Sequence, residues 1–172
     1  EKMGMSDSEI RSYFTGPTYL PWNRMANIDK WNGPLPMSWL EQQKMLQQRI
    51  LLRERSLNMK PVLPAFSGHV PAKLKELYPQ ANIKYLGRWA GFSDDYRCHF
   101  LNPEDPLFAK IQKMYLEEQK ALFGTDHIYG IDPFNEVDPP SWKPEYLKEI
   151  SHNIYRTVTS VDPGAEWMQM SW

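Results

Sequence analysis

Residues 127–140 read HIYGIDPFNEVDPP and combine a strand signal with polar side chains at its end. The first part, residues 127–134, is a short and mostly apolar run, which predicts a buried strand. Asn135 and Glu136 follow it directly, and prolines close the segment. The fold class then depends on which elements flank this strand.

Long amphipathic helices are expected on both sides of the strand. Asp105 and Pro106 occupy the capping and first-turn positions of a helix that ends at Gly124. An earlier helix is expected over residues 37–58, where Trp39 begins an apolar stripe at helical spacing. The helix that follows the strand carries its own stripe: Leu147, Ile150, Ile154, Val158 and Val161.

Three other short apolar runs are expected to be strands: residues 18–22, 61–66 and 166–172. Residues 79–104 are expected to be irregular and aromatic. Strands that alternate with helices predict parallel pairing through right-handed crossovers. A doubly wound sheet would usually carry a glycine-rich turn, and the sequence contains neither GxGxxG nor a P-loop.

We therefore predict an α/β fold that is part of a (β/α)8 TIM barrel, with about four strand–helix units. A whole barrel takes about 250 residues, so residues 1–172 are expected to be a fragment of a single barrel domain.

The composition argues against several classes of partner. Twenty Lys and Arg against 21 Asp and Glu give a net charge of -1, which provides no electrostatic reason to expect nucleic acid or an anionic membrane. No apolar run approaches the roughly 20 residues that span a bilayer. The histidines and the single cysteine lack metal-ligand spacing, so neither a metal nor another cofactor is expected. Cys98 is interpreted as a structural residue.

Functional residues of a barrel lie at the carboxyl ends of its strands. The residues that this rule places around one mouth are Trp22, His69, Trp89, Asn135, Glu136 and Trp172. The chain has seven Trp, and flat indole faces suit the C–H faces of pyranose rings. An aromatic-rich core is the alternative explanation for so many rings.

Glu136 is the sharpest candidate for chemistry. Its neighbours Phe134 and Val137 are apolar, and desolvation would raise the pKa of the carboxyl toward the range of a general acid. Asn135 could donate to a sugar hydroxyl. The alternative is a solvated loop carboxylate or a helix cap. His69 could act as a base or ligand, or as a structural residue that hydrogen-bonds its own loop.

Five long segments are similar to those of one known family. They are LPWNRMANIDKWNGPLP at 20–36, KPVLPAFSGHVP at 60–71, LNPEDPLF at 101–108, FGTDHIYGIDPFNEVDPP at 123–140 and EWMQMSW at 166–172. In order and spacing they resemble the α-N-acetylglucosaminidases, over nearly the whole chain.

This resemblance implies a catalytic TIM barrel that removes terminal α-linked N-acetylglucosamine with retention, using two glutamates about 5 Å apart. Glu136 matches the acid/base of the family's FNE motif. Trp22, Trp89, Asn135 and Trp172 match residues that surround the sugar. The family's nucleophile matches no glutamate here and is expected outside the chain. The implied partners are therefore the carbohydrate substrate and the remainder of the parent barrel, and the chain alone is expected to be inactive.

Two alternatives stay open at this point. The chain could be an inactive carbohydrate-binding barrel fragment, or a barrel that uses Glu136 for another reaction. Asn23 precedes Arg24 where the human member of the family has glycine, which favours a bacterial homologue. A periplasmic or extracellular location would follow, whereas the animal relatives are lysosomal, and glycans or glycosaminoglycan ends would be the substrates.

Overall fold

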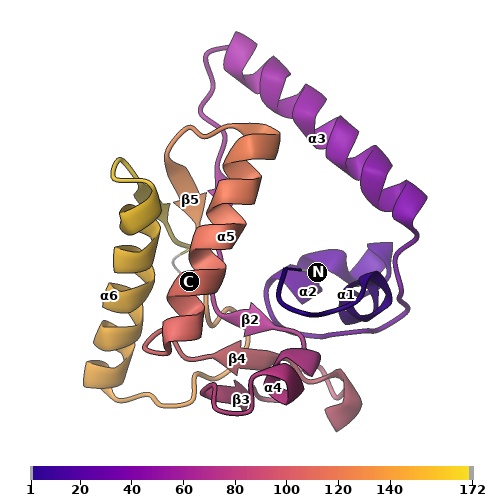
Figure 1. The fold of residues 1–172 in the computed structure, drawn as a ribbon, viewed down its shortest axis with the longest axis vertical. Helices are drawn as coiled ribbons and strands as arrows, with labels where there is room; N and C mark the ends of the chain where they lie inside the picture. Colours follow the sequence, from indigo (N-terminus) through magenta and orange to yellow (C-terminus); the bar gives the residue numbers. More distant parts are fainter. Residues whose placement is uncertain (1, 171–172) are drawn as a thin grey trace.

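The structure is a computed structural model that describes residues 2–170. Trp172, one of the expected site residues, lies outside the described residues. The chain forms a parallel sheet covered by two long helices, a small antiparallel sheet, and an N-terminal helical region (Figure 1). One further long helix extends away from this body.

The parallel sheet has the order β1-β5-β6, with bounds Leu63–Pro64, Ile128–Gly130 and Glu166–Met168. Helices α5 (Pro106–Phe123) and α6 (Pro144–Val161) connect these strands and lie side by side (Figure 1). The strands follow chain order across the sheet, so right-handed crossovers put both helices on one face. This is the arrangement of a barrel segment, because a doubly wound sheet has a switch point. The predicted α/β fold is confirmed.

The prediction of a strand at residues 18–22 is wrong. A 3₁₀ helix, η1 (Pro17–Tyr19), and helix α2 (Leu20–Arg24) occupy this stretch. The physical reason lies in Pro17 and Pro21, whose fixed φ and missing N–H suit the first turn of a helix. The described residues therefore contain three parallel strands, instead of the four expected.

Helix α1 begins the N-terminal region and spans Asp7–Tyr13. Ser6 and Glu9 form a capping box at its start, with the Ser6 backbone N–H donating to Glu9 Oε2 at 2.8 Å. The start of α1 is therefore set by local sequence.

Residues 79–104 are more regular than expected. Strands β3 and β4 and the 3₁₀ helix η2 lie within this range. With the preceding strand β2 they form an antiparallel sheet of order β2-β4-β3, and helix α4 follows β2. The bounds are His69–Val70 for β2, Lys73–Leu77 for α4, Ile83–Tyr85 for β3, Asp94–Tyr96 for η2 and His99–Leu101 for β4. The strands are only two or three residues long and pair with distant partners, so no local period reveals them. This small sheet is an insertion between β1 and α5.

Helix α3 spans Met37–Ser56 and confirms the helix predicted there. Its apolar stripe is mostly exposed, however, and Leu51 is its one buried residue. The helix rises away from the body in Figure 1 and is tied to it near its carboxyl end. There Arg55 donates to both carboxylate oxygens of Asp126, with Nε distances of 3.1 and 3.0 Å.

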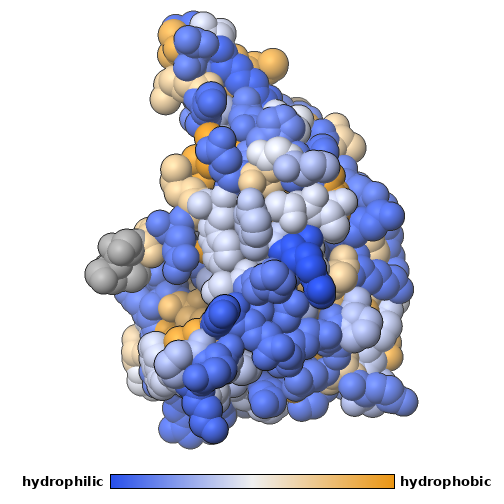
Figure 2. All heavy atoms as spheres, turned by 90° about the vertical axis from the view of Figure 1, so that its left-hand side faces the viewer, coloured by the Kyte–Doolittle hydropathy of each residue, from blue (hydrophilic) through white to orange (hydrophobic). Residues whose placement is uncertain are grey.

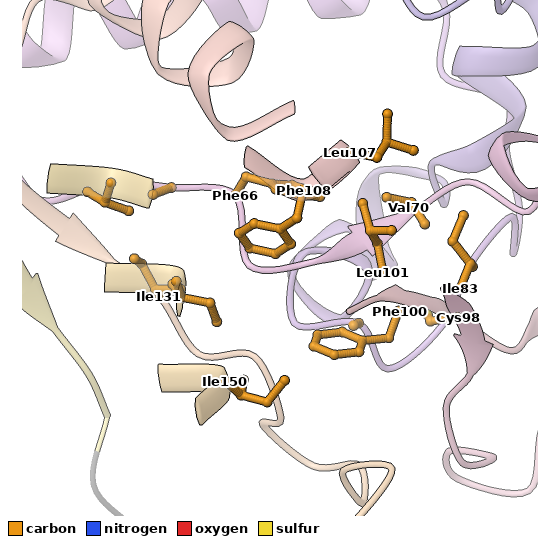
Figure 3. Packing of buried hydrophobic residues seen from close by; sticks show 14 of the residues in the cluster. Phe66, Val70, Ile83, Cys98, Phe100, Leu101, Leu107, Phe108, Ile131 and Ile150 are labelled. Carbon is orange, nitrogen blue, oxygen red and sulfur yellow. The ribbon is translucent and has the colours of Figure 1, made fainter. Parts of the chain in front are cut away.

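The hydrophobic core joins the two sheets to α5 and α6. Phe66 and Phe108 lie in the buried cluster with ring centroids 4.8 Å apart (Figure 3). Phe100 and Leu101, from the antiparallel sheet, belong to the same buried cluster. Both sheets are therefore held in one body, which fixes the loops above them relative to each other.

The outer face of the molecule over α6 is largely hydrophilic (Figure 2). Within residues 2–170, no helix is long and apolar enough to cross a membrane.

Candidate functional site

The candidate site forms where the loop after β5 meets the N-terminal region and the insertion. Trp89 lies in the loop between β3 and β4, and its indole Nε1 donates to Oε2 of Glu136 at 2.8 Å. Trp22, from α2, lies beside it, with ring centroids 6.0 Å apart and an interplanar angle of 37°. Three segments that are distant in sequence thus meet at one carboxylate.

An aromatic cluster holds the N-terminal region against the insertion. Trp31 contacts Phe92 edge-on, with centroids 4.9 Å apart, and Tyr96 at 5.1 Å. Phe92 in turn stacks on Trp89, with centroids 5.9 Å apart and rings 5° from parallel. Such pairs each contribute about 1 kcal/mol beyond the area they bury. The cluster therefore sets the position of Trp89.

The flanks of Glu136 are anchored in the core. Phe134 contacts Phe100 with ring centroids 4.9 Å apart, and Val137 is buried. Glu136 itself is exposed in this structure. The prediction that its apolar neighbours desolvate the carboxyl is therefore wrong. The loop presents the carboxylate at the surface while its neighbours hold the backbone.

His69 supports the same loop. Its Nε2 lies 2.9 Å from the Pro133 carbonyl, which can only accept, so Nε2 carries the proton. Nδ1 then accepts from Ser67 Oγ at 3.0 Å. Burial lowers the pKa of His69 to about 4, which keeps the ring neutral. The interpretation of His69 as a residue that hydrogen-bonds its loop is confirmed.

Two asparagine amides lie between this loop and the N-terminal region. Asn135 Nδ2 contacts Met25 Sδ at 3.1 Å, and its Oδ1 is buried without a hydrogen-bond partner in the described part of the chain. Asn27 was not singled out from the sequence. It is 2% exposed, and its Nδ2 lies 3.5 Å from Glu136 Oε2. Its place in the segment that also carries Trp22 is the one signal that could have drawn attention to it.

Below this loop lies a buried polar pair. Cys98 Sγ and Asn23 Nδ2 each donate to Asp29 Oδ1 at 3.1 Å. Burial raises the pKa of Asp29 to about 7, against the lowering effect of these hydrogen bonds. Burial also raises the pKa of the Cys98 thiol far above its usual value, so this thiol is a structural donor, as predicted.

Of the six residues expected around one mouth, Trp89 contacts both Trp22 and Glu136. Asn135 directly precedes Glu136, and His69 hydrogen-bonds the same loop, whereas Trp172 lies outside the described residues. Met170, which follows β6, donates its backbone N–H to Asp132 Oδ1 at 3.0 Å, in the segment after β5 that leads to Glu136. Among residues 2–170, no group of three or more His, Cys, Asp or Glu side chains is arranged to hold a metal ion.

Comparison with known proteins gives consistent matches over this whole stretch. A family model described as the α-N-acetylglucosaminidase (NAGLU) TIM-barrel domain matches residues 1–172. Human α-N-acetylglucosaminidase is 47% identical over 171 residues, which cover 99% of this chain and 23% of the human protein.

Solved structures of a family 89 glycoside hydrolase from Clostridium perfringens match with a TM-score of 0.88 and 31% identity. Two of them hold 2-acetamido-1,2-dideoxynojirmycin and PUGNAc, and each match covers 99% of this chain and 20% of that chain. In a third, two glutamates are replaced by glutamine and the substrate GlcNAc-α-1,4-galactose is bound. The chain spans less than a quarter of the length of these relatives.

Proposed function

Because this chain belongs to the α-N-acetylglucosaminidase family, we propose that residues 1–172 are part of the single TIM-barrel catalytic domain of a retaining glycosidase. The proposed reaction is removal of terminal α-linked N-acetylglucosamine from glycans. The observation that carries this proposal is the Glu136 carboxylate, which accepts from Trp89 Nε1, while the Trp89 ring lies beside that of Trp22.

Glu136 would act as the acid/base. In the first step its proton goes to the glycosidic oxygen as the bond to the anomeric carbon breaks. In the second step the carboxylate takes a proton from water, which attacks the glycosyl-enzyme. Retention requires a second carboxylate about 5 Å away as nucleophile. We assign this role to a glutamate outside residues 1–172, and the doubly substituted C. perfringens enzyme supports a pair of glutamates.

The sugar would bind against the aromatic side chains. Trp22 and Trp89 offer indole faces for the pyranose ring, and Trp172 would add a third. Asn135 Oδ1 has no hydrogen-bond partner in residues 2–170, which supports our assignment of this oxygen as an acceptor for a sugar hydroxyl once the remainder of the barrel is in place. The remainder of the parent barrel would close the pocket and supply the other contacts.

We also propose that the natural protein acts in the periplasm or outside a bacterial cell, on glycans that include glycosaminoglycan ends. The support is Asn23 before Arg24 and the similarity to the C. perfringens enzyme. Cell fractionation with an antibody to the protein tests this, and recovery in the cytosolic fraction would overturn it.

The proposed chemistry can be tested on the natural protein that carries this chain, with the Glu136→Gln variant beside it. Two substrates are needed: an aryl α-N-acetylglucosaminide with an activated leaving group, and a disaccharide with a poor one. We expect the variant to lose about 10²- to 10⁴-fold on the disaccharide and less on the aryl substrate, because an activated leaving group needs little protonation. The control is Glu145→Gln, an exposed carboxylate in the first turn of α6.

Each other outcome has a definite meaning. A natural protein that binds N-acetylglucosamine by calorimetry but hydrolyses neither substrate would be the inactive carbohydrate-binding alternative. Equal activity of the natural protein and Glu136→Gln would remove Glu136 from the acid/base role.

A further inference from the structure

Two N–H donors contact the carboxylate of Glu136, and both lie against the same oxygen, Oε2. Trp89 Nε1 donates to Oε2 at 2.8 Å, and the Asn27 amide nitrogen lies 3.5 Å from the same atom. The indole nitrogen can only donate, and an amide turned the other way would bring its oxygen against the carboxylate. Oε2 is therefore an acceptor from two sides.

Asn27 is held rigidly for this contact. It follows Ala26, which has a φ of 57°, and its backbone N–H donates to the Trp22 carbonyl at 2.9 Å. The side chain is 2% exposed, and within residues 2–170 its Oδ1 has no partner. A buried amide whose oxygen makes no hydrogen bond is costly to the fold. The amide is therefore poorly explained by a purely structural role, whereas its nitrogen faces the reacting carboxylate.

We propose that Asn27 is a positioning residue that, with Trp89, reserves Oε2 as an acceptor and leaves Oε1 of Glu136 to carry the proton. This inference rests on the proposed function. In the first step Oε1 gives its proton to the glycosidic oxygen, which keeps the electron pair of the breaking bond. In the second step Oε1 takes a proton from water, as the water oxygen bonds to the anomeric carbon and the nucleophile's carboxylate leaves.

The test is Asn27→Leu in the natural protein, because leucine has the same branched heavy-atom skeleton as asparagine and removes both the donor and the unpaired oxygen. We expect kcat/KM for the disaccharide to fall about tenfold to a hundredfold, the effect of one hydrogen bond to a charged group. For the activated aryl substrate the fall should stay within about threefold. Added azide should raise kcat on the aryl substrate, because azide attacks the glycosyl-enzyme without a general base.

The matched control is Asn23→Leu, the same substitution at an equally buried asparagine of the same segment, which contacts Asp29 rather than Glu136. This variant should have a lower melting temperature. Its kcat/KM should change by the same factor for both substrates, and azide should not raise its kcat. If Asn27→Leu fails to fold, Asn27→Ser replaces it, since the shorter hydroxyl cannot reach Oε2.

Failure of this inference is distinguishable from failure of the proposed function. Equal losses on both substrates by Asn27→Leu, without an azide response, would overturn the role of Asn27 while Glu136→Gln still showed the leaving-group dependence. Absence of that dependence in Glu136→Gln would overturn the acid/base assignment itself, and the inference with it.

Discussion

The indole N–H of Trp89 reaches the Glu136 carboxylate at 2.8 Å across 47 residues of sequence. Trp89 therefore has two surfaces with different uses. Its ring stacks on Phe92 and lies beside Trp22, in the aromatic surface that we propose for sugar binding, while its N–H holds the proposed acid/base. The two uses can be separated by substitution.

Replacing Trp89 with Phe keeps an aromatic face and removes the N–H donor. We expect kcat/KM on a poor leaving group to fall about tenfold, while binding of N-acetylglucosamine changes little. Trp89→Ala, which removes both surfaces, should weaken sugar binding as well. Steady-state kinetics and a product-inhibition constant measure the two effects. Equal loss of sugar binding in both variants would contradict the separation.

Asp29 should make the protein less stable as pH rises. Its pKa is raised from 3.8 to about 7 in the folded state, so between these values the folded protein binds more protons than the unfolded chain. The contribution of Asp29 to the free energy of unfolding should therefore fall across this window, by up to about 4 kcal/mol, and it is the difference between the natural protein and Asp29→Asn. Urea unfolding at a series of pH values measures it. Asp29→Asn should remove this contribution, and an unchanged slope in that variant would refute the assignment.

His69 should act in the opposite direction over a similar range. Its pKa is lowered from 6.5 to about 4, so its contribution is complete above 6.5 and is lost as pH falls toward 4. The loss is at most about 3 kcal/mol. His69→Ala should flatten this acid limb and speed amide exchange in the loop around Pro133, whose carbonyl accepts from the ring. Hydrogen-exchange mass spectrometry reports the second effect, and unchanged exchange there would contradict the support we assign to His69.

Gly68 should tolerate no side chain. Its φ is 109°, and a Cβ there would lie 2.5 Å from Phe100 Cε2 and 3.1 Å from the Leu101 carbonyl oxygen. We expect Gly68→Ala to lower the free energy of unfolding by about 2 kcal/mol or more, since both strain and overlap oppose it. Gly87→Ala is the control, because nothing lies within 4 Å of its added Cβ. Equal stability of the two variants would contradict the prediction.

What could be predicted from the sequence depended on the range of the interactions involved. Helix α5 was placed correctly because Asp105 caps it, with its side chain accepting from Leu107 N–H, and Gly124 ends it, both within a few residues. Residues 18–22 were assigned wrongly because a short apolar run with a proline fits either a strand or the first turn of a helix.

The site was predictable where a residue follows a strand, and hidden where its role comes from a distant partner. Glu136 and Asn135 were found because they follow β5. Asn27 was missed because its significance lies in a contact with Glu136, 109 residues away. The strands β2 and β4 were missed for the same reason, since neither is recognisable before the other is in place.

Because of the insertion between β1 and α5, the two residues that meet at the candidate site come from different sheets. Glu136 lies on the loop that follows the parallel strand β5, whereas Trp89 lies on the connection between β3 and β4 of the antiparallel sheet. That connection can change in length or composition without altering the register of any parallel strand. We therefore expect changes in this insertion to alter the surroundings of Glu136, the proposed acid/base, without moving the strand that precedes it.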